Sequence, residues 1–367
     1  MMRRRQFTLF ATAAVGGLGA VQACSSGADA ENYEQTALKT WRHGKVDVTD
    51  SVLLQRELVR YATLAPSSHN TQCWKFRRSD RAIEILPDLS RRCPAVDPDD
   101  HHVFVSLGCA AENLVQAALA HGLNGQASFD IGTGAVRIQF EATRAVASPL
   151  FQAIPERQCT RGEYDGKALT REELALLRQA GTGPGVQLLL LDDRPAMEKT
   201  LEYVVQGNTV QMDDKAFVDE LKAWIRFSGA DAVRTGDGLY AASSGNPSVP
   251  WWLGKLMFGM FFTPKSENDK YARQVRSSAG IAVFIGEKAN AAHWVDVGRC
   301  YERFALQAAA LGVRNAFLNQ PVEVATLRPQ FASALGIGDR RPDLVVRFGR
   351  GPKMPSSLRR PVQAVLV

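Results

Sequence analysis

The chain has 367 residues, of which 45% are hydrophobic and 22% are charged. This ordinary globular mixture is long enough to bury a large core in one or two domains. The formal net charge is +6, and three of those charges are Arg3, Arg4 and Arg5 in the first 23 residues, which contain no acid. So small a surplus, without a basic stripe interleaved with aromatic residues, excludes nucleic acid as the expected partner.

The N-terminus has the features of an export signal. Arg4-Arg5-Gln6-Phe7 fits a twin-arginine motif, and the apolar run from Leu9 to Val21 is short for a membrane span. We expect residues 1–23 to be a signal peptide, followed by a tether over residues 24–45. Cleavage before Cys24 would allow a lipid anchor on that cysteine, and ordinary cleavage after Ala23 is the alternative. The predicted location is the periplasm, with the protein either free or membrane-anchored as a lipoprotein.

The twin-arginine pathway exports proteins already folded, often around a cofactor, which is a first indication of a prosthetic group. The six cysteines show no C-x-x-C spacing. They indicate neither a redox role nor a particular disulfide.

The first elements alternate between helical and strand patterns. Val52 to Leu64 has apolar residues at helical spacing, and strands are predicted over residues 74–76 and 82–86. Between helix and strand lies a turn-rich run over residues 66–72. A long helix is predicted from Val103 to Gly122, where the glycine suits a C-terminal cap.

This long helix has a counterpart far down the chain. Residues 106–114 align without a gap to residues 296–304, at an offset of 190 that continues as far as Leu123 and Val313. Such self-similarity indicates an internal duplication. We therefore divide the folded part into a first half over residues 46–150 and a second half over residues 151–367.

An earlier pair of segments aligns at a different offset. The helix, turn and strand from Glu172 to Leu191 resemble Val52 to Phe76, with Pro184 matching Pro66. The second half must therefore contain an insertion, predicted over residues 193–276. A long insertion in a compact domain is often a lid. The aromatic residues of its stretch from Trp251 to Phe262 could equally serve packing alone.

Nucleotide-binding and hydrolase signatures are absent: there is no G-x-G-x-x-G, Walker loop, G-x-S-x-G or H-E-x-x-H. His101-His102 follow Asp99-Asp100, but adjacent histidines point to different sides of an element and no third ligand is near in sequence. We expect these histidines to lie at a solvated helix start and we expect no metal site.

The segment Ala65-Pro66-Ser67-Ser68-His69-Asn70-Thr71-Gln72-Cys73-Trp74 offers hydroxyl, amide and backbone groups between a helix and a strand. It resembles the P-S-x-x-N-x-Q-P-W loop of the nitroreductase family, which lies against the isoalloxazine ring of FMN. Cys73 replaces the proline of that pattern. The resemblance implies ring contacts from a group of loop residues, namely Pro66, Ser67, Ser68, His69, Asn70 and Gln72.

A second set of motifs resembles the phosphate site of the same family. Arg157-Gln158-Cys159-Thr160-Arg161 is similar to its arginine–hydroxyl–arginine clamp, and a capping box from Thr170 to Glu173 begins the following helix. Residues 347–352 and 359–361 resemble the closing strand and basic tail. The resemblance extends from residue 52 to residue 367 and is closest to the fused, Acg-like branch. It implies further cofactor-binding residues, namely Arg157, Thr160, Arg161, Ser277, Ser278, Gln320, Pro321, Arg350 and Arg359.

The distribution of these motifs predicts one site per chain. The ring loop is intact only in the first half, because its counterpart is Gly183-Pro184-Gly185-Val186, and the arginine clamp is recognisable only in the second half. Since ordinary nitroreductases build their sites between two subunits, the resemblance implies an α+β monomer that acts as a pseudo-dimer and binds one FMN.

The function implied by the resemblance is an FMN-dependent oxidoreductase that reduces a small acceptor through flavin N5, with no side chain assigned as catalytic. Its electron donor is unknown, because nicotinamide nucleotides are scarce outside the cytoplasm. A different class of function is a protein that sequesters or senses FMN under a closed lid. An exported binding protein without flavin is a third hypothesis.

Overall fold

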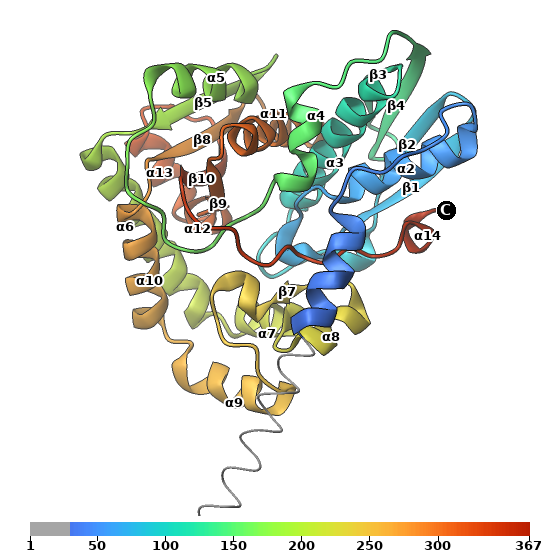
Figure 1. Ribbon diagram of the computed structural model, residues 1–367. Helices are drawn as coiled ribbons and strands as arrows, with labels where there is room; N and C mark the ends of the chain where they lie inside the picture. Colours follow the sequence, from blue (N-terminus) through green and yellow to red (C-terminus); the bar gives the residue numbers. More distant parts are fainter. Residues whose placement is uncertain (1–29) are drawn as a thin grey trace, which may run out of the picture.

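The computed structural model describes residues 30–367, so the predicted signal peptide and Cys24 lie outside the described residues. Two four-stranded sheets lie on either side of a central pair of helices (Figure 1).

The first half combines two helices with an antiparallel sheet. Its elements in chain order are α2 (Ser51–Thr63), β1 (Trp74–Ser79), β2 (Ala82–Pro87), α3 (His101–Ala120), β3 (Leu123–Asp130) and β4 (Ala135–Ala142). The strand order is β1-β2-β4-β3, and every neighbouring pair is antiparallel. Helix α2 begins where Asp50 accepts hydrogen bonds from the N–H groups of Val52 and Leu53.

The second half repeats this arrangement. Its corresponding elements are α5 (Arg171–Gly181), β5 (Val186–Leu191), β8 (Gly280–Gly286), α11 (Ala291–Ala310), β9 (Arg314–Phe317) and β10 (Pro342–Gly349). The sheet order is β5-β8-β10-β9, which is the order of the first sheet with each strand replaced by its counterpart. The predicted capping box at Thr170 and Glu173 is present. The predicted α+β fold of two similar halves is therefore confirmed.

The two halves meet where α3 crosses α11. A Cβ added to Gly108 would lie 2.0 Å from the carbonyl oxygen of Val295, and a Cβ added to Gly298 would lie 2.0 Å from that of Val105. The two contacts are related by the 190-residue offset, so they are the same contact made twice across a pseudo-twofold axis. Only glycine allows the backbones to approach this closely.

The insertion between β5 and β8 forms a group of helices along the left and lower sides of the molecule in Figure 1. Its elements are α6 (Arg194–Asp213), α7 (Lys215–Trp224), β6 (Ile225–Arg226), α8 (Gly229–Thr235), β7 (Leu239–Tyr240), η4 (Ala241–Ser244), α9 (Trp251–Phe261) and α10 (Pro264–Arg276). In the first half, a tight turn at residues 80–81 takes its place.

Short elements complete the described chain. They are η1 (Ser68–Asn70), η2 (Leu89–Arg91), α4 (Pro149–Ala153), η3 (Ile154–Glu156), α12 (Gln320–Glu323), α13 (Arg328–Ala334) and α14 (Val362–Val365). The main hydrophobic core extends through both halves, and a smaller core lies between α6, α13 and the second sheet. Helix α3 is long and apolar enough to cross a membrane, but most of it is buried in the main core.

The predicted tether is in part a packed helix. Residues 30–40 are helical, and Tyr33, Ala37 and Trp41 are buried. The Tyr33 hydroxyl donates to the carbonyl of Ser356 at 2.8 Å, and the Trp41 indole donates to that of Ser357 at 2.8 Å. This helix therefore packs against the C-terminal segment, which returns to the first half. Within residues 30–367, the five cysteines are free.

Candidate functional site

The loop between α2 and β1 has a strained backbone. His69, Asn70 and Gln72 have φ angles of 48°, 53° and 55°. This left-handed region costs a residue with a side chain about 1–2 kcal/mol. Such strain persists only where surrounding contacts impose it, and it is concentrated at functional sites. The conformation therefore marks this loop, singled out in the sequence, as a constrained part of the structure.

Contacts from the insertion and from the C-terminal segment hold the loop. The Asn70 amide donates to the carbonyl oxygens of Gly238 at 3.0 Å and Leu358 at 3.1 Å. The Gln72 amide donates to the carbonyl oxygen of Gly236 at 2.8 Å, and the Gln72 oxygen accepts from the backbone N–H of Arg360 at 2.8 Å. The turn of the insertion and the C-terminal segment therefore fix the loop that the first half contributes.

A cavity of about 470 Å³ lies beside this loop. This volume is within the range of small-molecule and cofactor sites. Both halves and the insertion contribute to its walls. The polar and ionisable lining residues are Ser67, Ser68, His69, His102, Ser106, Arg161, Asn208, Gln211, Ser244, Asn246, Glu267, Lys270, Tyr271, Asn319, Gln320 and Glu323.

The insertion supplies an apolar wall. Helix α7 contributes Phe217 and Leu221. Helix α9 and the residue that follows it contribute a row of large side chains, namely Met257, Phe258, Phe261 and Phe262. The rings of Phe258 and Phe262 stack with centroids 4.2 Å apart. The cavity therefore offers a hydrophobic surface opposite the polar groups of the two halves.

Two cationic side chains line the cavity. Lys270 on α10 lies 3.7 Å from the Glu267 carboxylate. The guanidinium group of Arg161 makes no hydrogen bond or ion pair with any residue from 30 to 367. The side-chain oxygen of Gln320 is buried and also lacks a partner within the described chain. A cation and an acceptor are thus available to a ligand.

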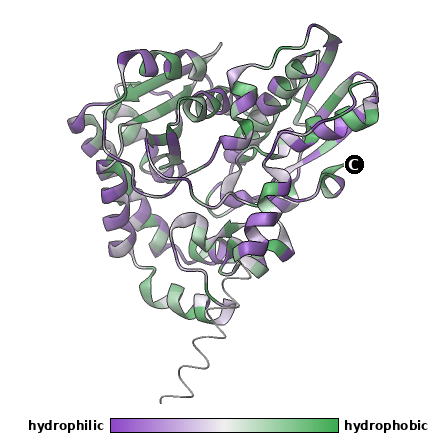
Figure 2. Cartoon of the chain, in the orientation of Figure 1, coloured by the Kyte–Doolittle hydropathy of each residue, from purple (hydrophilic) through white to green (hydrophobic). Residues whose placement is uncertain are grey.

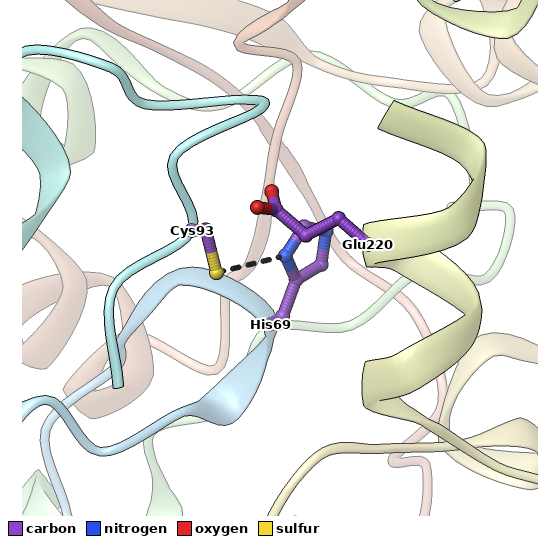
Figure 3. A group of neighbouring side chains, drawn as sticks. All are labelled: His69, Cys93 and Glu220. Carbon is purple, nitrogen blue, oxygen red and sulfur yellow. Dashed lines mark hydrogen bonds between the residues drawn. The ribbon is translucent and has the colours of Figure 1, made fainter. Parts of the chain in front are cut away.

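His69, Cys93 and Glu220 form a contact between the ring loop and the insertion (Figure 3). The His69 Nδ1 lies 3.5 Å from the Cys93 sulfur, and the Glu220 carboxylate accepts from the backbone N–H groups of Ala95 at 2.9 Å and Val96 at 3.2 Å. Burial, together with the charges of nearby cations, lowers the pKa of His69 to about 4. Burial and neighbouring acidic groups raise the pKa of Cys93.

These three groups are close enough to share a metal ion, but both Glu220 oxygens already accept backbone hydrogen bonds. We therefore interpret the cluster as a polar contact that ties α7 to the first half.

The adjacent histidines at the start of α3 are buried, so the expectation of a solvated helix start is wrong. His101 Nε2 lies 3.0 Å from the Asp343 carboxylate, and His102 Nε2 lies 3.3 Å from that of Glu323. The reason is tertiary: β10 and α12 of the second half cover the first turn of α3. Burial lowers the pKa of His102, but Asp97 and Glu323 outweigh that effect and raise it.

The predicted cofactor-binding residues separate into two groups. Six line the cavity: Pro66, Ser67, Ser68, His69, Arg161 and Gln320. Nine are not part of its lining: Asn70, Gln72, Arg157, Thr160, Ser277, Ser278, Pro321, Arg350 and Arg359. The cavity thus brings together the ring loop of the first half and one arginine of the clamp.

The other clamp residues contact protein groups. Arg157 pairs with the buried Glu302 carboxylate at 3.1 Å and donates to the Leu64 carbonyl at 2.6 Å. The Arg359 guanidinium donates to the carbonyls of Thr63, Leu64 and Ala65. Both cations therefore bind the C-terminal carbonyl groups of α2, where the helix dipole favours positive charge.

The remaining residues of this group are also engaged. Arg350 pairs with Glu173. The Thr160 hydroxyl donates to Gln158 at 3.0 Å, and those of Ser277 and Ser278 donate to the carbonyl of Gln274 at 3.1 and 2.7 Å. Pro321 is buried in α12. A direct cofactor contact from these residues stays a prediction.

Sequence reasoning missed several residues of the cavity. Asn208 and Gln211 come from α6, and Lys270 and Tyr271 come from α10, both inside the insertion. His102 comes from α3. The insertion helices carry no motif that would have identified their residues.

Comparisons with known proteins bear on the family resemblance and on the fold. No protein-family model matches the chain. The chain is 24% identical over 326 residues to the Mycobacterium tuberculosis protein named "Putative NAD(P)H nitroreductase Rv3131", covering 85% of this chain and 90% of that protein. It is 21% identical over 344 residues to "Putative NAD(P)H nitroreductase acg" of the same organism, covering 87% and 96%. These relatives confirm the resemblance to the nitroreductase superfamily and its Acg-like branch.

Solved structures with similarity to the chain cover little more than half of it. A Bacteroides fragilis nitroreductase with bound FMN is 15% identical, with a TM-score of 0.34, over 56% of this chain and 89% of that one. The Mycobacterium smegmatis FMN-dependent nitroreductase NfnB, in complex with NADPH, is 12% identical, with a TM-score of 0.37, over 55% and 87%. Because these TM-scores are low, the strand orders of the two halves define the fold of this chain more clearly than the similarity to solved structures does.

Proposed function

We propose that the chain binds one FMN in the cavity between its halves and acts as an oxidoreductase of nitroreductase type. The observation that carries this proposal is the composite cavity, where a strained first-half loop faces an unpaired arginine and a free glutamine oxygen of the second half. The names of the curated relatives support the same class of activity.

The residues present fit this cofactor. FMN combines a flat aromatic ring that has donors and acceptors on its edge with a phosphate group. Arg161 and Lys270 supply positive charge for the phosphate, and Ser67 and Ser68 supply hydroxyl groups at the ring loop. The Gln320 oxygen is a buried acceptor without a partner in the described chain. FMN, when bound, supplies hydride and electron transfer through its ring.

The residues of the chain would bind the cofactor, orient it and shield it from water. The ring loop is held rigid by Asn70 and Gln72, so its backbone does not need to be ordered when a ligand binds. The aromatic side chains of α7 and α9 exclude water from one side of the cavity. His69 is neutral at pH 7, and its Nδ1 lies 3.5 Å from the Cys93 sulfur.

The first experiment measures FMN content and affinity. Purified protein is expected to show flavin absorption bands at one FMN per chain. Arg161→Ala should weaken FMN binding by roughly tenfold or more, because a charge-assisted hydrogen bond contributes about 1.5–3 kcal/mol. Arg77→Ala is the matched control, since its exposed guanidinium pairs with Glu84 on the first sheet, outside the cavity. A colourless protein that cannot be reconstituted with FMN would contradict the proposal.

A second candidate function is FMN sequestration or sensing. It is favoured by the side chains of α7 and α9, which extend from the insertion into the cavity wall. Anaerobic addition of NADPH followed by dithionite distinguishes the two functions. Bleaching by NADPH identifies a working reductase of a small acceptor such as a nitroaromatic compound or a quinone. Bleaching by dithionite alone favours sequestration or a different donor.

We also propose that residues 1–23 direct export by the twin-arginine pathway and that the exported protein is a monomer. Cell fractionation tests the export signal. Arg4→Lys with Arg5→Lys should retain the protein in the cytoplasm, whereas secretion of this variant would refute that route. Metabolic labelling with a fatty acid tests Cys24, with Cys24→Ser as the unlabelled control.

A further inference from the structure

Helix α9 has an outer face of exposed, large apolar side chains. Trp252, Leu256 and Met260 are 59%, 54% and 54% exposed, and they are spaced four residues apart on one face. Trp251 is 55% exposed at the start of the helix, and Phe261, which also lines the cavity, is 63% exposed at its end. Figure 2 shows this helix as a largely hydrophobic segment at the lower edge of the molecule. A continuous apolar face of this kind marks an interaction surface.

The inner face of α9 is fixed to the body. A Cβ added to Gly254 would lie 2.3 Å from the ring of Phe227, so the helix packs closely at that point. Met257 and Phe258 line the cavity on the same inner side. The exposed face therefore has no room to turn inward, and its apolar groups stay at the surface.

The sequence of α9 and its flanks carries positive charge. Residues 238–266 contain no acidic residue and include Lys255 and Lys265, of which Lys265 pairs with Asp269 at 2.8 Å. The Lys255 ammonium lies 4.0 Å from the centroid of the Trp251 ring, and that of Lys222 on α7 lies 5.2 Å from the centroid of the Phe258 ring. Tryptophan with lysine at the edge of an apolar helix face is typical of helices that lie in a membrane interface.

The outer face is too small for a stable protein dimer. An 11-residue helix is about 16 Å long and about 10 Å wide, giving a footprint on the order of 160 Å². A stable protein interface needs about 800 Å² from each partner. A bilayer does not have this requirement, because it accepts a short helix and adds attraction between its anionic headgroups and lysine.

The start of the described chain lies on the same side of the molecule. The helix over residues 30–40 lies beside α8 and β7, at the lower side that also carries α9 (Figure 1). The ring of Tyr33 is 4.2 Å from that of Tyr240 on β7. The described part of the chain therefore begins near this face.

We propose that the outer face of α9 binds the surface of a lipid bilayer that contains anionic lipids, with the helix lying in the plane of the interface. The apolar row of Trp252, Leu256 and Met260 enters the headgroup region, and Lys255 contacts the phosphate groups. Because the inner face of α9 lines the cavity, this single helix separates the cavity from the bilayer. The proposal depends neither on a bound flavin nor on a lipid at Cys24.

The test uses residues 30–367, the folded body that holds both cores and lacks the N-terminal apolar run. Partitioning is measured by sedimentation with vesicles of phosphatidylcholine alone or mixed with phosphatidylglycerol. Binding is expected to the mixed vesicles, together with a blue shift of tryptophan fluorescence. The triple variant Trp252→Ala, Leu256→Ala, Met260→Ala should lose roughly tenfold or more in partitioning. Lys255→Ala should lose about fivefold on mixed vesicles only.

Ile131→Ala is the matched control, because Ile131 is 87% exposed on a turn of the first half, away from α9. It should bind vesicles like the parent. Circular dichroism establishes that each variant is folded. Failure of the parent to bind either vesicle, or equal binding by the triple variant, would overturn the proposal. Analytical ultracentrifugation provides a second test. A dimer that the triple variant abolishes would also overturn the proposal, because a second copy of the chain would then cover the outer face of α9.

Discussion

Gly298 offers the sharpest test of the helix crossing. In Gly298→Ala, the new methyl group would lie 2.0 Å from the carbonyl oxygen of Val105 and 3.1 Å from the amide nitrogen of Cys109. A carbon atom normally keeps about 3.3 Å from such an oxygen. Both neighbours are backbone atoms, so no side chain can move aside. The two central helices must separate by about 1 Å, and this disturbs the core that joins the halves.

The expected loss can be estimated from two opposing effects. Overpacking a well-packed core costs about 1–3 kcal/mol, and a clash with backbone belongs at the upper end of that range. Replacing glycine by alanine inside a helix gains about 1 kcal/mol. The free energy of unfolding of Gly298→Ala should therefore fall by about 2 kcal/mol, as measured by urea unfolding followed by circular dichroism.

Gly259→Ala is the matched control, because Gly259 lies inside α9 with no atom within 4 Å of its added Cβ. It should leave stability unchanged or raise it by up to about 1 kcal/mol. The double variant Gly108→Ala, Gly298→Ala should lose less than the sum of the single variants, since one separation of the helices relieves both clashes. If Gly298→Ala were as stable as Gly259→Ala, the close crossing of α3 and α11 would be refuted.

Three further predictions concern individual contacts. Arg157→Met leaves the Glu302 carboxylate buried without its cation and should cost about 3 kcal/mol in urea unfolding; an unchanged midpoint would contradict a buried pair. Thr170→Ala removes the hydroxyl that accepts from Glu173 N–H and should cost about 1 kcal/mol by the same assay, with no loss if the cap is not formed. Burial lowers the pKa of His69 from 6.5 to about 4, so its contribution to stability is complete above pH 6.5 and is lost as the pH falls toward 4. Between pH 6.5 and 4, the free energy of unfolding of the parent should fall by up to about 1.4 kcal/mol more per pH unit than that of His69→Gln. If the two plots of unfolding free energy against pH were parallel, a buried neutral ring at His69 would be refuted.

The repeated architecture could be predicted from the sequence because it leaves a local, periodic signal. The alignment of residues 106–114 with 296–304 indicated the duplication, and the structure places Gly108 and Gly298 in equivalent positions of the two helices. The capping box at Thr170 needs only residues three positions apart. Patterns of this kind can be recognised in a single sequence, because the residues involved are either close together in the chain or occur in two similar copies.

The directions of the arginine side chains could not be predicted in the same way. The clamp motif does not distinguish Arg157 from Arg161. In the structure, Arg157 forms an ion pair with Glu302, which is distant in sequence, and of these two arginines only Arg161 lines the cavity. The burial of His101 also depends on a distant partner, Asp343. Such pairings arise from tertiary packing, and spacing within a motif does not encode them.

The fusion of two similar halves gives each copy its own evolutionary path. In a symmetric dimer of identical chains, every substitution and every insertion occurs twice, once on each side of the axis. Here the helices between β5 and β8 occur once, and a tight turn takes their place between β1 and β2. The cavity therefore gains a cover from one half alone, without a matching insertion in the other half.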